Sequence, residues 1–382
     1  MVELEMTHIY LDYNASAPLH PDVWRVMEPI LNPECGAHNA SSVHYYGRAG
    51  RKIIEDARCH VSDLVGADVN QVIFNSGATE GNNTVLRHFT EKYPDESILI
   101  SAVEHPSVSE AISANGGCVR VVPVDGDGLI RLDVLADMLS TQEKVSLLSC
   151  MYVNNETGVV QDIHALSALA HKYGALFHCD ATQGVGRIPV DMRADGIDFL
   201  TLSSHKIGGP QGGGALVLGL CGQTPQLLIG GGQEKSARAG TENVAGIAGF
   251  GAAAQVVRDG LDTYQDLAIL RDKLEEGLKV ISPDVIIHSE NVSRVVNTSF
   301  FSLNGANSQS MLMAFDLEGI ALSNGSACSS GTVKPSVTLK AMGKSAEIAS
   351  SALRVSLGWA TKEGDIDAFL SAWKKIYSRI NT

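Results

Sequence analysis

The stretch Thr201-Leu-Ser-Ser-His-Lys-Ile-Gly-Gly-Pro210 completes a nearly apolar run, residues 197–202, that predicts a buried β-strand. Lys206 follows at the polar end of this strand. A low-dielectric position lowers the pKa of a lysine and favours its neutral amine, which can form a Schiff base with a carbonyl compound. The alternative is a lysine that begins a surface turn, because most lysine side chains are exposed. The rest of the chain has to decide between these interpretations.

Strands and helices alternate on both sides of this stretch. The predicted strands of the larger part are residues 71–75, 97–101, 119–124, 145–153, 175–179, 199–204 and 214–218. Stretches with helical spacing precede or separate these strands, for example residues 47–65 and 162–173. This alternation predicts an α/β fold with a mainly parallel, seven-stranded mixed sheet flanked by helices.

The pattern changes after Gly219, and length and composition fit two domains. The chain has 382 residues, of which 44% are hydrophobic. This length exceeds that of one ordinary domain. We expect a large domain of residues 15–260 and a smaller α+β domain of residues 1–14 and 261–382, with one long helix over residues 262–280.

Charge and hydropathy exclude several classes of partner. The formal net charge is −14, which argues against nucleic acid or an anionic membrane surface as the main partner. The sequence contains no run of about 18 apolar residues and its first ten residues do not resemble a signal segment. We therefore expect a cytoplasmic protein without a membrane span.

Polar residues follow the predicted strands at their carboxyl ends. The set is Thr79, His105, Asn155, Asp180, Gln183, His205 and Lys206. In open α/β sheets the ligand crevice lies at this edge. His105 alone would be interpreted as a capping or surface histidine, and Asp180 alone as a helix N-cap. Together, the seven residues indicate one shared ligand site.

Pyridoxal phosphate is a ligand whose chemical requirements match these residues. Its aldehyde needs a lysine, its ring nitrogen an acid, and its phosphate a set of N–H and hydroxyl donors. Lys206 supplies the amine and Asp180 the acid. The turn at residues 76–81 precedes a predicted helix, and free N–H groups at a helix N-terminus bind anions, although such a turn is as often only a turn.

The remaining candidates have narrower roles. The phosphate donors would be Ala78, Thr79, Ser203, His205 and Thr241. His105 would stack on the ring, and Gln183 and Asn155 would bond to its phenolic oxygen or to the substrate. Arg354 presents a planar fork that suits a substrate carboxylate.

The seven cysteines do not predict disulfides or a zinc site, because their number is odd and no pair has CxxC spacing. Six lie in apolar or helical surroundings, where a thiol is usually a small core residue. Cys328 lies in a loop of small residues instead. It is either an incidental loop thiol or a reactive one, since reactivity requires an exposed thiolate.

The motifs together resemble a known family. They are Tyr10-Leu-Asp-Tyr-Asn-Ala15, Ser76-Gly-Ala-Thr-Glu80, Glu104-His105, Val153-Asn-Asn-Glu156, His178-Cys-Asp-Ala-Thr-Gln183, Ser204-His-Lys206, Arg238-Ala-Gly-Thr241, Ser326-Ala-Cys328 and Arg354-Val-Ser-Leu-Gly358. Spread over almost the whole chain, they resemble the NifS/IscS-type cysteine desulfurases of the class V aminotransferase family, fold type I pyridoxal phosphate enzymes.

The resemblance implies a role for each site residue. Lys206 would bond to the cofactor and then move a proton at the substrate Cα, with His105 stacked on the ring. The cofactor would also contact Ala78, Thr79, Asn155, Asp180, Gln183, Ser203 and His205, and Asn155 would in addition contact the substrate. Arg354 would bind the carboxylate of L-cysteine. Cys328, as thiolate, would attack the substrate sulfur, leaving L-alanine and a persulfide.

The resemblance also implies partners. Thr241 would reach the phosphate in the partner subunit, so the site would require a homodimer. The persulfide sulfur would pass to an acceptor protein for iron–sulfur cluster or other sulfur-cofactor biosynthesis. Cys328 would at most ligate a cluster transiently, and we expect no metal site of the protein's own. The chain ends soon after its last predicted helix, which counts against docking of the iron–sulfur scaffold.

Two alternatives remain open at this point. One is a selenocysteine lyase or a related lyase or aminotransferase of the same fold. The other is a non-catalytic sulfur-carrier or regulatory subunit, because a fold alone does not imply a function.

Overall fold

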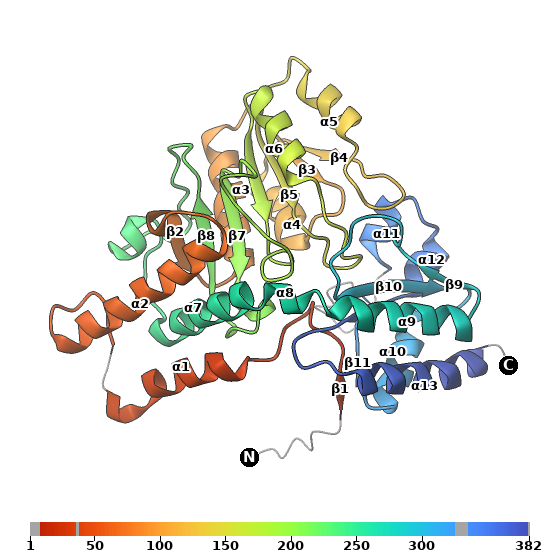
Figure 1. Ribbon diagram of the computed structural model, residues 1–382. Helices are drawn as coiled ribbons and strands as arrows, with labels where there is room; N and C mark the ends of the chain where they lie inside the picture. The colour runs from red at the N-terminus through yellow and green to blue at the C-terminus, as the bar shows by residue number, and fades with distance from the viewer. Residues whose placement is uncertain (1–7, 36–37, 325–334, 381–382) are drawn as a thin grey trace.

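A seven-stranded mixed sheet forms the centre of the computed structural model, which describes residues 8–35, 38–324 and 335–380 (Figure 1). Its strand order is β2-β8-β7-β6-β5-β3-β4. The strands are β2 (Val72–Asn75), β3 (Ser97–Ser101), β4 (Val119–Val122), β5 (Val145–Met151), β6 (Leu176–Asp180), β7 (Phe199–Ser203) and β8 (Gly214–Leu218). β8 pairs antiparallel with both β2 and β7, and the other neighbouring pairs of this sheet are parallel, so the predicted mainly parallel sheet is confirmed.

Helices flank this sheet, as the sequence predicts. They are α1 (Pro21–Leu31), α2 (Tyr45–Leu64), α3 (Ala78–Lys92), α4 (Pro106–Asn115), α5 (Leu132–Leu139), α6 (Ile163–Lys172) and α7 (Val244–Asp259). Short 3-10 turns are η1 (Pro33–Cys35), η2 (Val69–Gln71), η3 (Ser204–Lys206) and η4 (Gln233–Ser236). Every residue of β3 and β5 is buried, which explains their nearly continuous apolar sequences.

Helices α1, α2 and α7 pack as one group at the β2 side of the sheet (Figure 1). A Cβ atom at Gly251 of α7 would lie 2.5 Å from the Cα atom of Ala57 in α2. Only a glycine allows this approach without displacing a backbone. The glycines of α7 are therefore packing residues, and a ligand is not needed to explain them.

The C-terminal part of the chain, together with the N-terminal strand β1, forms two small sheets. Strands β9 (Val285–Ile287), β10 (Thr298–Leu303) and β12 (Ala352–Ser356) are antiparallel, and β1 (Ile9–Tyr10) pairs in parallel with β11 (Ile320–Ala321). The helices here are α8 (Leu261–Tyr264), α9 (Leu267–Ile281), α10 (Ser308–Leu317), α11 (Val337–Ala341), α12 (Ala346–Ser350) and α13 (Glu363–Ile380). The predicted division into residues 15–260 and 1–14 with 261–382 stays a prediction.

A separate hydrophobic cluster belongs to this part. Phe315 stacks on Phe369 with ring centroids 4.9 Å apart, and Trp373 is completely buried beside them. Leu11 joins the same cluster from the N-terminal segment. Each such buried side chain stabilises the fold by roughly 1.5–3 kcal/mol. The N-terminal segment is thereby fixed against the end of the chain.

The single helix predicted over residues 262–280 is wrong. The chain divides into α8 and α9, because tighter bonds from Gln265 N to Asp262 O (3.2 Å) and from Asp266 N to Thr263 O (3.2 Å) replace the α-helical pattern. The side chain of Gln265 also donates to the carbonyl of Arg187 at 3.0 Å. The local periodicity of the sequence could not predict this contact, because it joins two distant parts of the chain.

The cysteine prediction is correct only in part. Cys150 and Cys179 are buried, whereas Cys59 and Cys118 are exposed. Cys59 lies on the solvent side of α2, so helical spacing alone did not place it in the core. Within the described part of the chain, every helix is too short or too polar to cross a membrane.

Candidate active site

A cavity of about 820 Å³ lies at the carboxyl ends of the parallel strands. Most predicted site residues line it, namely Ala78, Thr79, His105, Asn155, Asp180, Gln183, Ser203, His205, Lys206 and Arg354. Two predicted residues are not brought together with them. Thr241 is exposed and is not part of the lining, and Cys328 lies outside the described residues.

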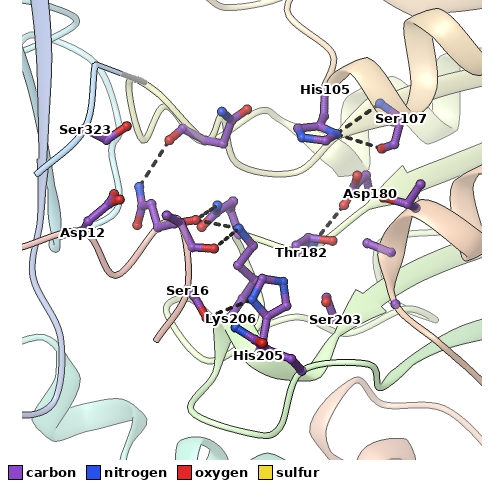
Figure 2. A pocket seen from close by; sticks show the side chains of 18 of the residues that line it. Asp12, Ser16, His105, Ser107, Asp180, Thr182, Ser203, His205, Lys206 and Ser323 are labelled. Carbon is purple, nitrogen blue, oxygen red and sulfur yellow. Dashed lines mark hydrogen bonds between the residues drawn. The ribbon is translucent and has the colours of Figure 1, made fainter. Parts of the chain in front are cut away.

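Lys206 ends η3, directly after β7, and lies between Asp12 and Asp180 (Figure 2). Its Nζ atom donates to the carbonyls of Asn14 at 2.6 Å and Ala15 at 2.8 Å. Burial, with the positive charges of Arg354 and Arg187 as further causes, lowers the pKa of Lys206 to about 7. A large fraction of this amine is therefore neutral near neutral pH, as the position after a buried strand predicts.

Asp180 is the last residue of β6, and two donors fix its carboxylate. Oδ2 accepts a hydrogen bond from Asn82 Nδ2 at 2.7 Å, and Oδ1 accepts one from the backbone N–H of Thr182 at 3.0 Å. Asn82 is completely buried on α3. Sequence reasoning missed Asn82, although it lies four residues after Ala78 and so on the same face of the helix.

His105 is both a helix cap and a cavity residue. Its Nδ1 atom accepts a hydrogen bond from the backbone N–H of Ser107 at 3.1 Å and lies 2.8 Å from the Ser107 hydroxyl, an interaction drawn in Figure 2. Burial lowers the pKa of His105. The ring is therefore neutral at physiological pH and presents a flat apolar face to the cavity, which its bonds to Ser107 hold in place.

Part of the cavity lining consists of groups that can bind an anion. Ala78 and Thr79 begin α3, whose N-cap is Gly77, a residue with no side chain to bond to the first N–H groups. Ser203 and His205 line the same cavity. Burial, and then the charge of Lys206, lower the pKa of His205 to about 4, so this ring contributes a neutral hydrogen-bonding group. A helix N-terminus and neutral donors are the groups that bind phosphate.

Arg354 extends from β12 toward this cavity and is only partly paired. Nη1 donates to the carbonyl of Asn155 at 2.8 Å, and Nη2 donates to Asp12 Oδ1 at 2.7 Å. Its Nε atom is buried and has no hydrogen-bond partner among the described residues. The guanidinium can therefore donate a hydrogen bond to a further carboxylate. Asp12 was not predicted as its partner, although it lies in the motif at residues 10–15.

Both flanks of the segment that carries Cys328 are held beside the cavity. Ser323 and Arg354 exchange backbone hydrogen bonds of 3.2 and 2.6 Å, and residues 322–324 line the cavity. After residues 325–334, which the structure does not describe, Ser336 and Thr338 donate their hydroxyls to Glu156. Glu156 follows the lining residue Asn155 directly.

Fold and site together define a fold type I protein of the α/β class with a buried lysine at the centre of its site. A family model described as "Aminotransferase class-V" matches residues 9–369. The chain therefore belongs to the class V aminotransferase family, as the resemblance in the sequence implied.

Relatives cover nearly the whole chain. A protein named cysteine desulfurase from Cereibacter sphaeroides is 38% identical over 98% of this chain and 97% of its own length. Cysteine desulfurase IscS from Dictyoglomus turgidum is 37% identical over 98% of this chain and 95% of its own. The solved structure of a NifS-like protein from Rickettsia africae is 38% identical, with a TM-score of 0.89, over 97% of this chain and 99% of that one.

Proposed function

We propose that the protein is a cysteine desulfurase that uses pyridoxal phosphate to remove sulfur from L-cysteine. The observation that carries the proposal is a lysine with a pKa lowered to about 7 in one cavity with Asp180, the N-terminus of α3 and Arg354. Relatives named cysteine desulfurase support it, since they match over nearly their whole length.

The cavity residues fit this cofactor. The first N–H groups of α3, with Ser203 and His205, would hold the phosphate, and Asp180 would pair with the ring nitrogen. Gln183 adds an argument, because its Oε1 atom is buried and lacks a hydrogen-bond partner within the described ranges. The hydroxyl of the ring would satisfy it. When bound, the cofactor supplies an electron sink that stabilises negative charge on the substrate carbons.

The side chains around the substrate would then bind it and move its protons. Arg354 would hold the carboxylate of L-cysteine through its free Nε atom. Lys206 would take the proton from Cα, for which a pKa of about 7 is well suited near neutral pH. His105 would stack on the ring and keep its face dry.

The sulfur step falls to Cys328. Its thiolate would attack the sulfur atom of L-cysteine, so that a sulfur–sulfur bond forms while the Cβ–sulfur bond breaks. The electron pair of the broken bond stays on the carbon side, where a proton completes L-alanine. Cys328 lies four residues beyond Asn324, a cavity residue, and four residues span at most about 14 Å. The tether is thus short enough for the thiol to reach the site.

We further propose a homodimer, a sulfur acceptor and a cytoplasmic location. Thr241 is exposed, which suits a residue that completes the phosphate site of a second subunit. The persulfide sulfur would pass to an acceptor protein for iron–sulfur cluster or other sulfur-cofactor biosynthesis.

The holoenzyme with L-cysteine tests the proposal. We expect one L-alanine for each sulfur atom removed from L-cysteine. Mass spectrometry should find one added sulfur on the peptide that contains Cys328. Cys328→Ser should keep the cofactor spectrum and lose sulfur release, whereas Cys59→Ser, at an exposed thiol of α2, should keep both. Lys206→Ala should lose the cofactor's lysine-bound absorbance. Full sulfur release by Cys328→Ser would refute the sulfur step, and faster turnover of selenocysteine would favour the lyase alternative.

A further inference from the structure

A second cavity, of about 380 Å³, lies on the other side of Lys206. Lys206 lines both cavities, and the segment 12–20 contributes different residues to each of them. Asp12, Asn14 and Ser16 line the first cavity, whereas Tyr13, Ala17 and His20 line the second. This segment is therefore a partition between two separate spaces.

Arg187 is the charged group of this second cavity, and it is 3% exposed. Its Nη1 atom is buried and has no hydrogen-bond partner in the described part of the chain. Its backbone is fixed by a bond from Arg187 N to Gly184 O at 3.0 Å and by the Gln265 side chain at 3.0 Å. A buried, unpaired guanidinium costs several kcal/mol, so such groups normally have an anion beside them.

The neighbouring protein groups do not provide that anion. Among the residues that the structure describes, neither an aspartate nor a glutamate lines the second cavity. Burial is the main cause that lowers the pKa of Arg187, and the charged or ionisable groups that act on it next are Tyr264 and Arg354. Burial raises the pKa of Tyr264 to about 12, so its phenol stays neutral, and Arg354 carries a like charge.

The rest of the lining indicates which kind of anion would fit beside Arg187. Tyr13, Tyr264 and Trp359 contribute rings, and aliphatic residues such as Ile207 and Leu267 complete the walls. A guanidinium fork suits a planar carboxylate.

We propose that this second cavity binds a small monocarboxylate with a flat apolar body, whose carboxylate pairs with Arg187. Trp359 lines this cavity, is 44% exposed and packs edge-on against His20 with ring centroids 4.8 Å apart. This inference does not depend on the proposed reaction, because the residues that carry it lie outside the first cavity, apart from the shared Lys206.

Tryptophan fluorescence of the holoenzyme tests the proposal, with 4-bromobenzoate as the probe. Bromine quenches a tryptophan that it contacts, and Trp359 lines the second cavity but not the first. The other tryptophans are Trp24, on α1, and the fully buried Trp373. We expect saturable quenching in the wild type that Trp359→Phe abolishes. A carboxylate bound only at Arg354 would leave Trp359 unaffected.

Two comparisons isolate the charge pair. Arg187→Met should weaken binding at least tenfold, while Arg187→Lys, which keeps the positive charge, should weaken it less. In the wild type, neutral 4-bromobenzamide should bind at least tenfold more weakly than 4-bromobenzoate, and this comparison needs no variant to fold.

Three results would overturn the proposal. They are quenching that stays linear with concentration, equal affinity for the acid and the amide, and competition by inorganic phosphate as strong as that by benzoate.

Discussion

The lowered pKa of Lys206 makes a quantitative prediction about its reactivity. Burial is the largest cause, followed by the charges of Arg354 and Arg187, and the pKa falls from 10.5 to about 7. At pH 7.5 about three quarters of such an amine is neutral, against about 0.1% at a pKa of 10.5. The shift therefore raises the concentration of reactive amine by nearly three orders of magnitude.

The rate at which cofactor-depleted protein takes up pyridoxal phosphate reports this neutral fraction. Stopped-flow absorbance between pH 5.5 and 10 should show a rate that rises about tenfold per pH unit below the pKa of Lys206 and levels off above about pH 8. A peptide lysine measured in parallel, with its rate divided by its own neutral fraction, gives the correction for the ionisation of the cofactor itself. Without the shift, the corrected rate would keep rising beyond pH 9, and that result would refute the reasoning.

Removing one of the charges tests the cause. Arg187 lowers the pKa of Lys206, so Arg187→Met should move the midpoint of the uptake profile to higher pH. Arg187→Lys retains the positive charge and is the matched control. A midpoint that moves to lower pH in Arg187→Met, or moves equally in both variants, would contradict an electrostatic effect.

Two further substitutions test groups that the fold places in buried contacts. Asn82→Ala removes a 2.7 Å donor to Asp180; since such bonds to charged groups contribute roughly 1.5–3 kcal/mol, cofactor retention in dialysis should weaken at least about tenfold. Glu234→Gln leaves the buried guanidinium of Arg58 without its 2.7 Å carboxylate partner and should cost about 3–5 kcal/mol in urea unfolding. The matched control Glu55→Gln removes the half-exposed partner of Arg58 and should cost less than about 1 kcal/mol; equal losses would show that burial does not matter here.

The sheet and most cavity residues were predictable because they depend on local signals. Buried parallel strands have nearly continuous apolar sequences, and ligand residues follow their carboxyl ends. Asp180, His105 and Lys206 could therefore be placed at one edge before their distances were known. The family resemblance added roles that the residues alone left open, among them the attack of Cys328 on the substrate sulfur.

The contacts that tune these residues could not be predicted, because they join distant parts of the chain. The bond between Asn82 and Asp180 spans 98 positions and that between Arg354 and Asp12 spans 342. The pairing of Arg58 with Glu234 spans 176 positions and leaves no periodic trace in either segment. Periodicity reports which face of an element is buried, but the partner across the interface depends on tertiary packing.

Asn14 shows how these distant contacts reach the central lysine. Its carbonyl accepts hydrogen bonds from both Lys206 (2.6 Å) and Gln183 (2.9 Å), so it touches two groups of the first cavity. Its N–H donates to the hydroxyl of Ser356 and its side-chain amide to the hydroxyl of Thr298, each at 2.9 Å. Ser356 belongs to β12, which also carries Arg354, and Thr298 belongs to β10, the strand that pairs with β12. A displacement of the small sheet would therefore move Arg354 and the acceptor of Lys206 together. Asn14 belongs to the segment 12–20, which separates the two cavities. The position of the small sheet therefore also affects the wall of the cavity that contains Arg187.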